Sequence, residues 1–102
     1  MAFDPATGTE VQKTRPAVIV SNDSANRALK RVVVVPLTSN ASKVYPGQSL
    51  VSIDGKTGKA MCDQIMAADK SRLVGRLGEV SRDELGELDR ALRVHLGRDV
   101  AP

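Results

Sequence analysis

Aromatic residues are nearly absent from this chain of 102 residues, which has one phenylalanine, one tyrosine and no tryptophan. A core must therefore be built from Val, Leu, Ile, Ala and Met, and only Phe3 and Tyr45 could stack on nucleic-acid bases. No apolar run approaches the roughly 20 residues that a membrane-spanning helix needs. The first residues also lack the basic and apolar regions of a signal peptide. We therefore expect a single cytoplasmic domain over residues 1–102, with no membrane partner.

Cysteine and histidine each occur only once. The lone Cys62 excludes an internal disulfide and any cysteine-based zinc cluster, and it is most simply a small core residue. His95 has neither a second histidine nor an acidic cluster to help it bind a metal. Ser-His-Asp and Cys-His catalysis are equally unsupported, and no Gly-rich phosphate loop is present. The sequence therefore predicts no metal and no cofactor.

Positive charge is concentrated in one part of the chain. Residues 13–59 contain eight basic and two acidic side chains and so carry a charge of +6, although the whole chain carries only +3. Such a concentration is typical of a protein that binds an anionic partner, most often nucleic acid. A lysine-rich surface that only keeps the protein soluble is the alternative.

Short apolar runs separated by turn-forming residues predict a series of strands. The expected strands cover residues 16–21, 32–38, 49–53, 60–66 and 74–80. Alternation in the fourth of them would place Met61 and Cys62 on opposite faces. The valine run of the second suits a central strand, and Pro36 should end its ladder pairing or mark a bulge. Single helical turns fit residues 25–29 and 69–73.

The end of the chain predicts an amphipathic helix over residues 81–97. Ser81 and Glu84 form the pattern of a capping box, and Gly97 is a suitable stop. The apolar stripe of this helix consists of Leu85, Leu88, Leu92 and Leu96. Strands followed by one helix predict a mainly β fold, either a small antiparallel β-barrel or a strongly bent sheet, with the C-terminal α-helix packed on it.

Two polar residues stand at strand ends where they could meet. Arg15 precedes the first strand and Thr38 ends the second, so antiparallel pairing would bring them to one edge of the sheet. A permanent cation beside a hydroxyl, near Lys13 and Lys43, could hold a phosphate. Such a site needs no metal if the substrate supplies its own nucleophile, as RNA does with its 2′-OH. On spacing alone, however, ordinary strand ends are the favoured interpretation.

Several motifs occur in order along the chain. They are TGTE at residues 7–10, RPAVIVSND at 15–23, PLTS at 36–39, YP at 45–46, DQI at 63–65 and VGRLGEVS at 74–81. In this order and at these intervals they resemble the MazF/PemK family of toxin endoribonucleases, also called mRNA interferases. The resemblance implies a dimeric, SH3-like β-barrel that a cognate MazE-like antitoxin holds in check. It also implies a metal-independent, sequence-specific ribonuclease for single-stranded RNA, and no DNA partner for the toxin alone.

The same resemblance implies roles for individual residues. Arg15 corresponds to a catalytic arginine that stabilises charge on the scissile phosphate, and Thr38 to a catalytic threonine that hydrogen-bonds it. The expected chemistry is attack by the 2′-OH, which leaves a cyclic phosphate and a 5′-OH. The residues expected to shape the RNA groove are Glu10, Gln12, Lys13, Ser39, Lys43 and Tyr45.

The chain departs from the family pattern at its start. Family members begin with a strand of the type Arg-Gly-Asp-Ile-Trp-x-Val-Asp that leads into Asp-Pro, here Asp4-Pro5, and most of that strand is missing. We expect either an internal start site or a sheet edge that the dimer or the antitoxin covers. A second hypothesis therefore stays open, namely an inactive or truncated toxin-fold protein that binds antitoxin, or gyrase, without cleaving RNA. A generic basic nucleic-acid-binding barrel is a third.

Overall fold

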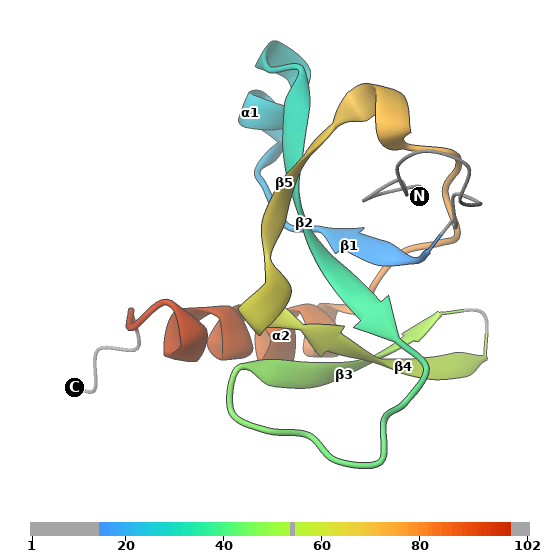
Figure 1. Ribbon diagram of the computed structural model, residues 1–102, viewed down its shortest axis with the longest axis vertical. Helices are drawn as coiled ribbons and strands as arrows, with labels where there is room; N and C mark the ends of the chain where they lie inside the picture. The colour runs from blue at the N-terminus through green and yellow to red at the C-terminus, as the bar shows by residue number, and fades with distance from the viewer. Residues whose placement is uncertain (1–14, 54, 99–102) are drawn as a thin grey trace, which may run out of the picture.

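The computed structural model describes residues 15–53 and 55–98 (Figure 1). In chain order they form β1 (Ala17–Ile19), α1 (Asp23–Ala28), β2 (Arg31–Thr38), β3 (Gln48–Ile53), β4 (Lys56–Met61), the 3₁₀ turn η1 (Cys62–Gln64), β5 (Met66–Asp69), the 3₁₀ turn η2 (Lys70–Arg72) and α2 (Arg82–His95). The five strands pair antiparallel in one strongly bent sheet, with α2 packed against β3. The predicted mainly β architecture with a terminal helix is what the structure has.

β2 is the central strand of the sheet. One of its edges pairs with β1, and the other pairs first with β5, over residues 31–34, and then with β4, over residues 37–38. Val34 and Val35 are fully buried. An uninterrupted apolar run suits a strand that is covered on both faces, so the valine run correctly predicted a central strand.

Pro36 stands where β2 changes its partner on one edge. Val34 is the last residue of β2 that pairs with β5, and Leu37 is the first that pairs with β4. Proline has no N–H to donate, and neither neighbour requires one at this position. The predicted break in the ladder is therefore confined to this edge, because Pro36 still pairs with Ala17 of β1 on the other.

α2 closes the core from one side of the sheet. Its first turn is capped by Ser81, whose side-chain oxygen accepts the Glu84 N–H at 3.2 Å, as the sequence predicted. The Glu84 carboxylate in turn accepts the backbone N–H of Ser52 at 2.8 Å, which ties the helix to β3. Leu88 and Ala91 are buried against the sheet. Within the residues that the structure describes, no helix is long and apolar enough to cross a membrane.

The strand predicted over residues 60–66 is wrong. β4 ends at Met61, and the chain then turns through η1, where the Ile65 N–H donates to the Cys62 carbonyl at 3.1 Å. This turn moves the chain away from β3 and delivers β5 to the edge of β2. Alternation therefore stops at Cys62, because a tight turn replaces extended backbone there.

The strand predicted over residues 74–80 is also wrong. This segment joins η2 to α2 and pairs with no other strand in the described part of the chain. Val74 and Leu77 remain 67% and 63% exposed. The apolar pattern is present, but in the described part of the chain the segment lines a groove opposite β1 and does not pair with it.

Candidate functional site

Arg15 and Thr38 meet at one edge of the sheet. The Leu37 N–H donates to the Pro16 carbonyl at 3.1 Å, which continues the β1–β2 register beyond the end of β1. One further step in the same register sets Arg15 opposite Thr38. Opposed residues of antiparallel strands project from the same face, with Cβ atoms about 4.5–5.5 Å apart. A guanidinium and a hydroxyl therefore share this edge, and within residues 15–53 and 55–98 no hydrogen bond or ion pair occupies Arg15.

Lys59 extends this pair into a row across the sheet. The β2–β4 register sets Lys59 opposite Thr38, and the β3–β4 register sets it opposite Leu50. Arg15, which precedes β1, is thus followed across the sheet by Thr38 of β2, Lys59 of β4 and Leu50 of β3, on the same face. In the sequence, Lys59 is one of eight basic residues between positions 13 and 59 and has no further distinguishing mark. Its position beside Thr38 depends on pairing between residues 21 positions apart.

The Thr38 hydroxyl is oriented by the loop that follows it. Its oxygen accepts the backbone N–H of Asn40 at 3.3 Å. The Asn40 side-chain oxygen accepts the hydroxyl of Ser42 at 2.9 Å, which closes a second small turn. Because the Thr38 oxygen is used as an acceptor, its proton is free to point outward as a donor. A phosphate oxygen is a suitable acceptor for it.

Gly58 allows β4 to approach Thr38 closely. A Cβ at this position would lie 3.0 Å from the Thr38 carbonyl oxygen. The absence of a side chain on Gly58 therefore sets the distance between the two strands next to the row.

A cavity of about 320 Å³ opens beside Thr38. Its walls combine aliphatic and polar residues from five parts of the fold, namely Pro16, Leu37, Thr38, Ser39, Val51, Ile53, Lys56, Thr57, Gly58 and Leu77. Lys56 adds a further cation to this end of the sheet.

The loop that leaves β2 carries three of the residues that we expected to bind RNA. Ser39, Lys43 and Tyr45 are all exposed, and the Lys59 ammonium donates to the Lys43 carbonyl at 3.0 Å. The structure thus brings this loop against the row. The other expected RNA-binding residues, Glu10, Gln12 and Lys13, lie outside the described residues.

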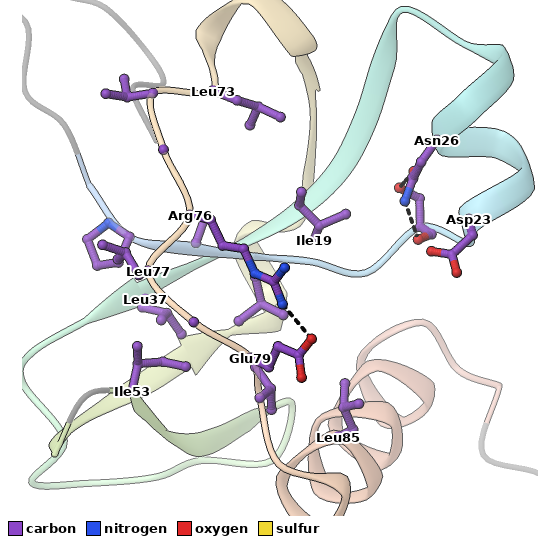
Figure 2. A pocket seen from close by; sticks show the side chains of 18 residues that line it. Ile19, Asp23, Asn26, Leu37, Ile53, Leu73, Arg76, Leu77, Glu79 and Leu85 are labelled. Atoms are coloured by element: carbon purple, nitrogen blue, oxygen red, sulfur yellow. Dashed lines mark hydrogen bonds and ion pairs between the residues drawn. The ribbon is translucent and has the colours of Figure 1, made fainter.

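A larger groove of about 820 Å³ runs between β1 and the segment that leads from η2 to α2 (Figure 2). The aliphatic side chains of Ile19, Leu77 and Leu85 line it, and Arg76 forms an ion pair with Glu79 beside it. Among its described lining residues, no nucleophile is paired with a base. The groove is therefore an apolar surface rather than a reaction centre.

The titratable groups do not suggest an alternative centre. Burial raises the pKa of the Cys62 thiol to about 11, with a smaller contribution from the negative charge of Asp63. Such a thiol stays protonated and unreactive, as a small core residue would. Backbone and side-chain hydrogen bonds from Ser71 lower the pKa of Asp69, at the opposite end of β2. No group of three or more His, Cys, Asp or Glu side chains that could hold a metal gathers in the described ranges.

A family model for PemK-like, MazF-like toxins of type II toxin–antitoxin systems matches residues 1–96. The chain belongs to this toxin family. It is 47% identical over 104 residues to Endoribonuclease MazF9 of Mycobacterium tuberculosis (strain ATCC 25618 / H37Rv), which covers 92% of this chain and 87% of the relative. It is 37% identical over 93 residues to Endoribonuclease PemK of Escherichia coli, which covers 86% of this chain and 70% of the relative.

Solved structures of toxins share the fold. An endoribonuclease in complex with its cognate antitoxin, from a mycobacterial species, superimposes with a TM-score of 0.78 at 28% identity and covers 99% of this chain and 94% of its own. The family resemblance drawn from the ordered motifs and the predicted MazF-like fold class are thus both confirmed.

Proposed function

We propose that this toxin is a metal-independent endoribonuclease that cleaves single-stranded RNA at short sequences. The β1–β2 register, continued to Arg15 and Thr38 at a sheet edge that also carries Lys56 and Lys59, is the observation that supports the proposal. The relatives named endoribonucleases support the same activity.

In the proposed reaction the 2′-oxygen of the substrate attacks the adjacent phosphorus and the bond to the 5′-oxygen breaks. The proton lost by the 2′-OH is balanced by one gained at the departing 5′-oxygen. Arg15 donates to the non-bridging oxygens and offsets the negative charge that develops on them, and the Thr38 hydroxyl donates to the same group. The products are a 2′,3′-cyclic phosphate and a 5′-OH. The substrate supplies the nucleophile, so the row needs to supply only position and positive charge.

We also propose the partners that accompany this activity. A cognate MazE-like antitoxin restrains the toxin, a proposal that the solved complex of its mycobacterial relative supports. The toxin forms a homodimer and works as a single domain over residues 1–102. Its site of action is the cytoplasm, where bacterial RNA is made and translated.

Incubation with a long single-stranded RNA in EDTA tests the proposal. We expect the wild type to cut it and to leave cyclic-phosphate and 5′-OH ends, and we expect RNA with 2′-O-methyl groups to stay intact. Arg15→Ala and Thr38→Val should each lower the cleavage rate by about 10²-fold or more, because each removes a donor to the developing charge. Arg27→Ala is the matched control, since Arg27 is an exposed arginine of α1 away from this edge.

Intact RNA with the wild type, or equal cleavage by wild type and Arg15→Ala, would contradict the proposal. Tight binding of the antitoxin without any cleavage would instead support the second hypothesis, a toxin-fold protein that only binds.

A further inference from the structure

We propose that Tyr45 forms a nucleobase-stacking subsite beside the Arg15–Thr38 edge, and that Lys59 is the positioning residue that holds it there. The inference rests on the proposed function, because it takes the ligand to be single-stranded RNA. It adds a base-binding element and names Lys59, to which the sequence assigned no role.

Tyr45 is the residue best suited to stack on a nucleobase, because aromatic rings are rare in this chain. The chain has one tyrosine, one phenylalanine at position 3 and no tryptophan, so Tyr45 is the only such ring among the described residues. Its side chain is 56% exposed. Proteins bind single-stranded nucleic acid by combining a positively charged groove with aromatic rings on which bases stack. The charged part lies at the Arg15–Thr38 edge, and the ring is at the end of the loop that starts there.

The backbone of Tyr45 is fixed by a tight turn. Tyr45, Pro46, Gly47 and Gln48 show the pattern of a type II turn, with proline second and a glycine of φ +85° third. The Gln48 N–H donates to the Tyr45 carbonyl at 3.0 Å, and the Gln48 side-chain oxygen accepts the Tyr45 N–H at 3.1 Å. Both polar groups of the Tyr45 backbone are therefore held by one residue of β3. A ring on such a turn loses little freedom when a base stacks on it.

Lys59 fixes the side chain and the loop together. Its backbone is opposite Thr38 in the sheet, and its ammonium donates to the Lys43 carbonyl at 3.0 Å. The same ammonium lies 6.0 Å from the centroid of the Tyr45 ring. The cation is held over one face of the ring by a strand, which leaves the other face for a base. Lys59 thus joins the strand position opposite Thr38 to the loop and the ring of Tyr45.

Intrinsic fluorescence gives a direct measurement, because all tyrosine emission comes from Tyr45 and no tryptophan masks it. The probe is a short single-stranded RNA with 2′-O-methyl groups and a terminal dye, so that it binds without being cut. We expect its addition to quench Tyr45 emission with the same half-saturation as the rise in dye anisotropy. Tyr45→Leu should raise Kd by about 5- to 100-fold, the range that loss of one base–aromatic stack represents.

Lys59→Met should raise Kd by about 2- to 5-fold and reduce the quenching, and Lys59→Arg should restore both. Lys30→Met is the matched control: it removes the same charge from an exposed lysine at the far end of β2, and its quenching should equal that of wild type. Because Lys59 acts through Tyr45, Lys59→Met should cost little further affinity in a Tyr45→Leu background. In cleavage assays Lys59→Met should raise KM by a larger factor than it lowers kcat.

Anisotropy that reports binding while Tyr45 emission stays constant would overturn the inference, as would fully additive losses in the double variant. Cleavage of unmodified RNA, assayed in parallel, separates the two levels. Cleavage without any change in Tyr45 emission on RNA binding overturns the stacking subsite alone. Absence of both binding and cleavage overturns the subsite and the proposed function together.

Discussion

Replacement of Gly58 by alanine tests how closely β4 and β2 must approach at the site. The new Cβ would lie 3.0 Å from the Thr38 carbonyl oxygen, whereas ordinary contacts of this kind begin at 3.4 Å. The two strands would therefore have to separate locally by about 0.4 Å, and the atom that must move belongs to the backbone of Thr38. Overpacking of this kind costs about 1–3 kcal/mol of unfolding free energy. If a 1 Å misplacement costs about 10²-fold in rate, a shift of 0.4 Å costs about sixfold in kcat.

Urea denaturation measures the expected loss of unfolding free energy, and RNA cleavage by the same preparations measures the expected loss of kcat. Gly86→Ala is the matched control, because Gly86 is an exposed glycine of α2 with no atom within 4 Å of a new Cβ. A glycine-to-alanine change inside a helix stabilises it by about 0.5–1 kcal/mol, so this variant should be slightly more stable and equally active. Wild-type stability together with wild-type kcat in Gly58→Ala would refute the reasoning.

Two further predictions concern the core. Leu88→Ala should lower the unfolding free energy by about 2–5 kcal/mol, because Leu88 is only 1% exposed. Leu85 lies on the same helix but is 48% exposed, so Leu85→Ala should cost less than about 1 kcal/mol, and equal losses would contradict the packing described for α2. Burial raises the pKa of Cys62 from 9.0 to about 11, so the folded state resists ionisation and stability should fall as pH rises between these values, by about 2–3 kcal/mol in total. The unfolding free energy of Cys62→Ala should fall less over this range, and parallel pH profiles for the two proteins would contradict the assignment.

The part of the fold that sequence could predict is the part in which local pattern and final environment agree. The valine run of β2 is apolar on both faces and the strand is covered on both. Ser81 and Glu84 lie three positions apart and cap the helix that follows them. Arg15 and Thr38 could be placed together because adjacent strands in the chain commonly pair.

The rest depended on contacts that local pattern does not encode. Lys59 reaches Thr38 only through the β2–β4 register, and residues 74–80 have a strand-like pattern but line a groove opposite β1 instead of pairing with it. Cys62 continues the buried face of β4, and its N–H donates to the Gly47 carbonyl at 3.2 Å, one step beyond the Gln48–Met61 pair, at the point where the chain turns. For Lys59 and for residues 74–80, contacts outside the local sequence decide what the residues do.

Because β2 is the central strand, the order in which its partners pair with it decides when the edge at Thr38 is complete. The hairpin of β3 and β4 closes around a two-residue loop, but Thr38 pairs with Lys59 across 20 intervening residues and Arg31 pairs with Asp69 across 37. Contacts between such distant residues carry the larger loop-closure entropy and form late. The proposed site at Thr38 is therefore completed late in folding, after β4 has paired with β2.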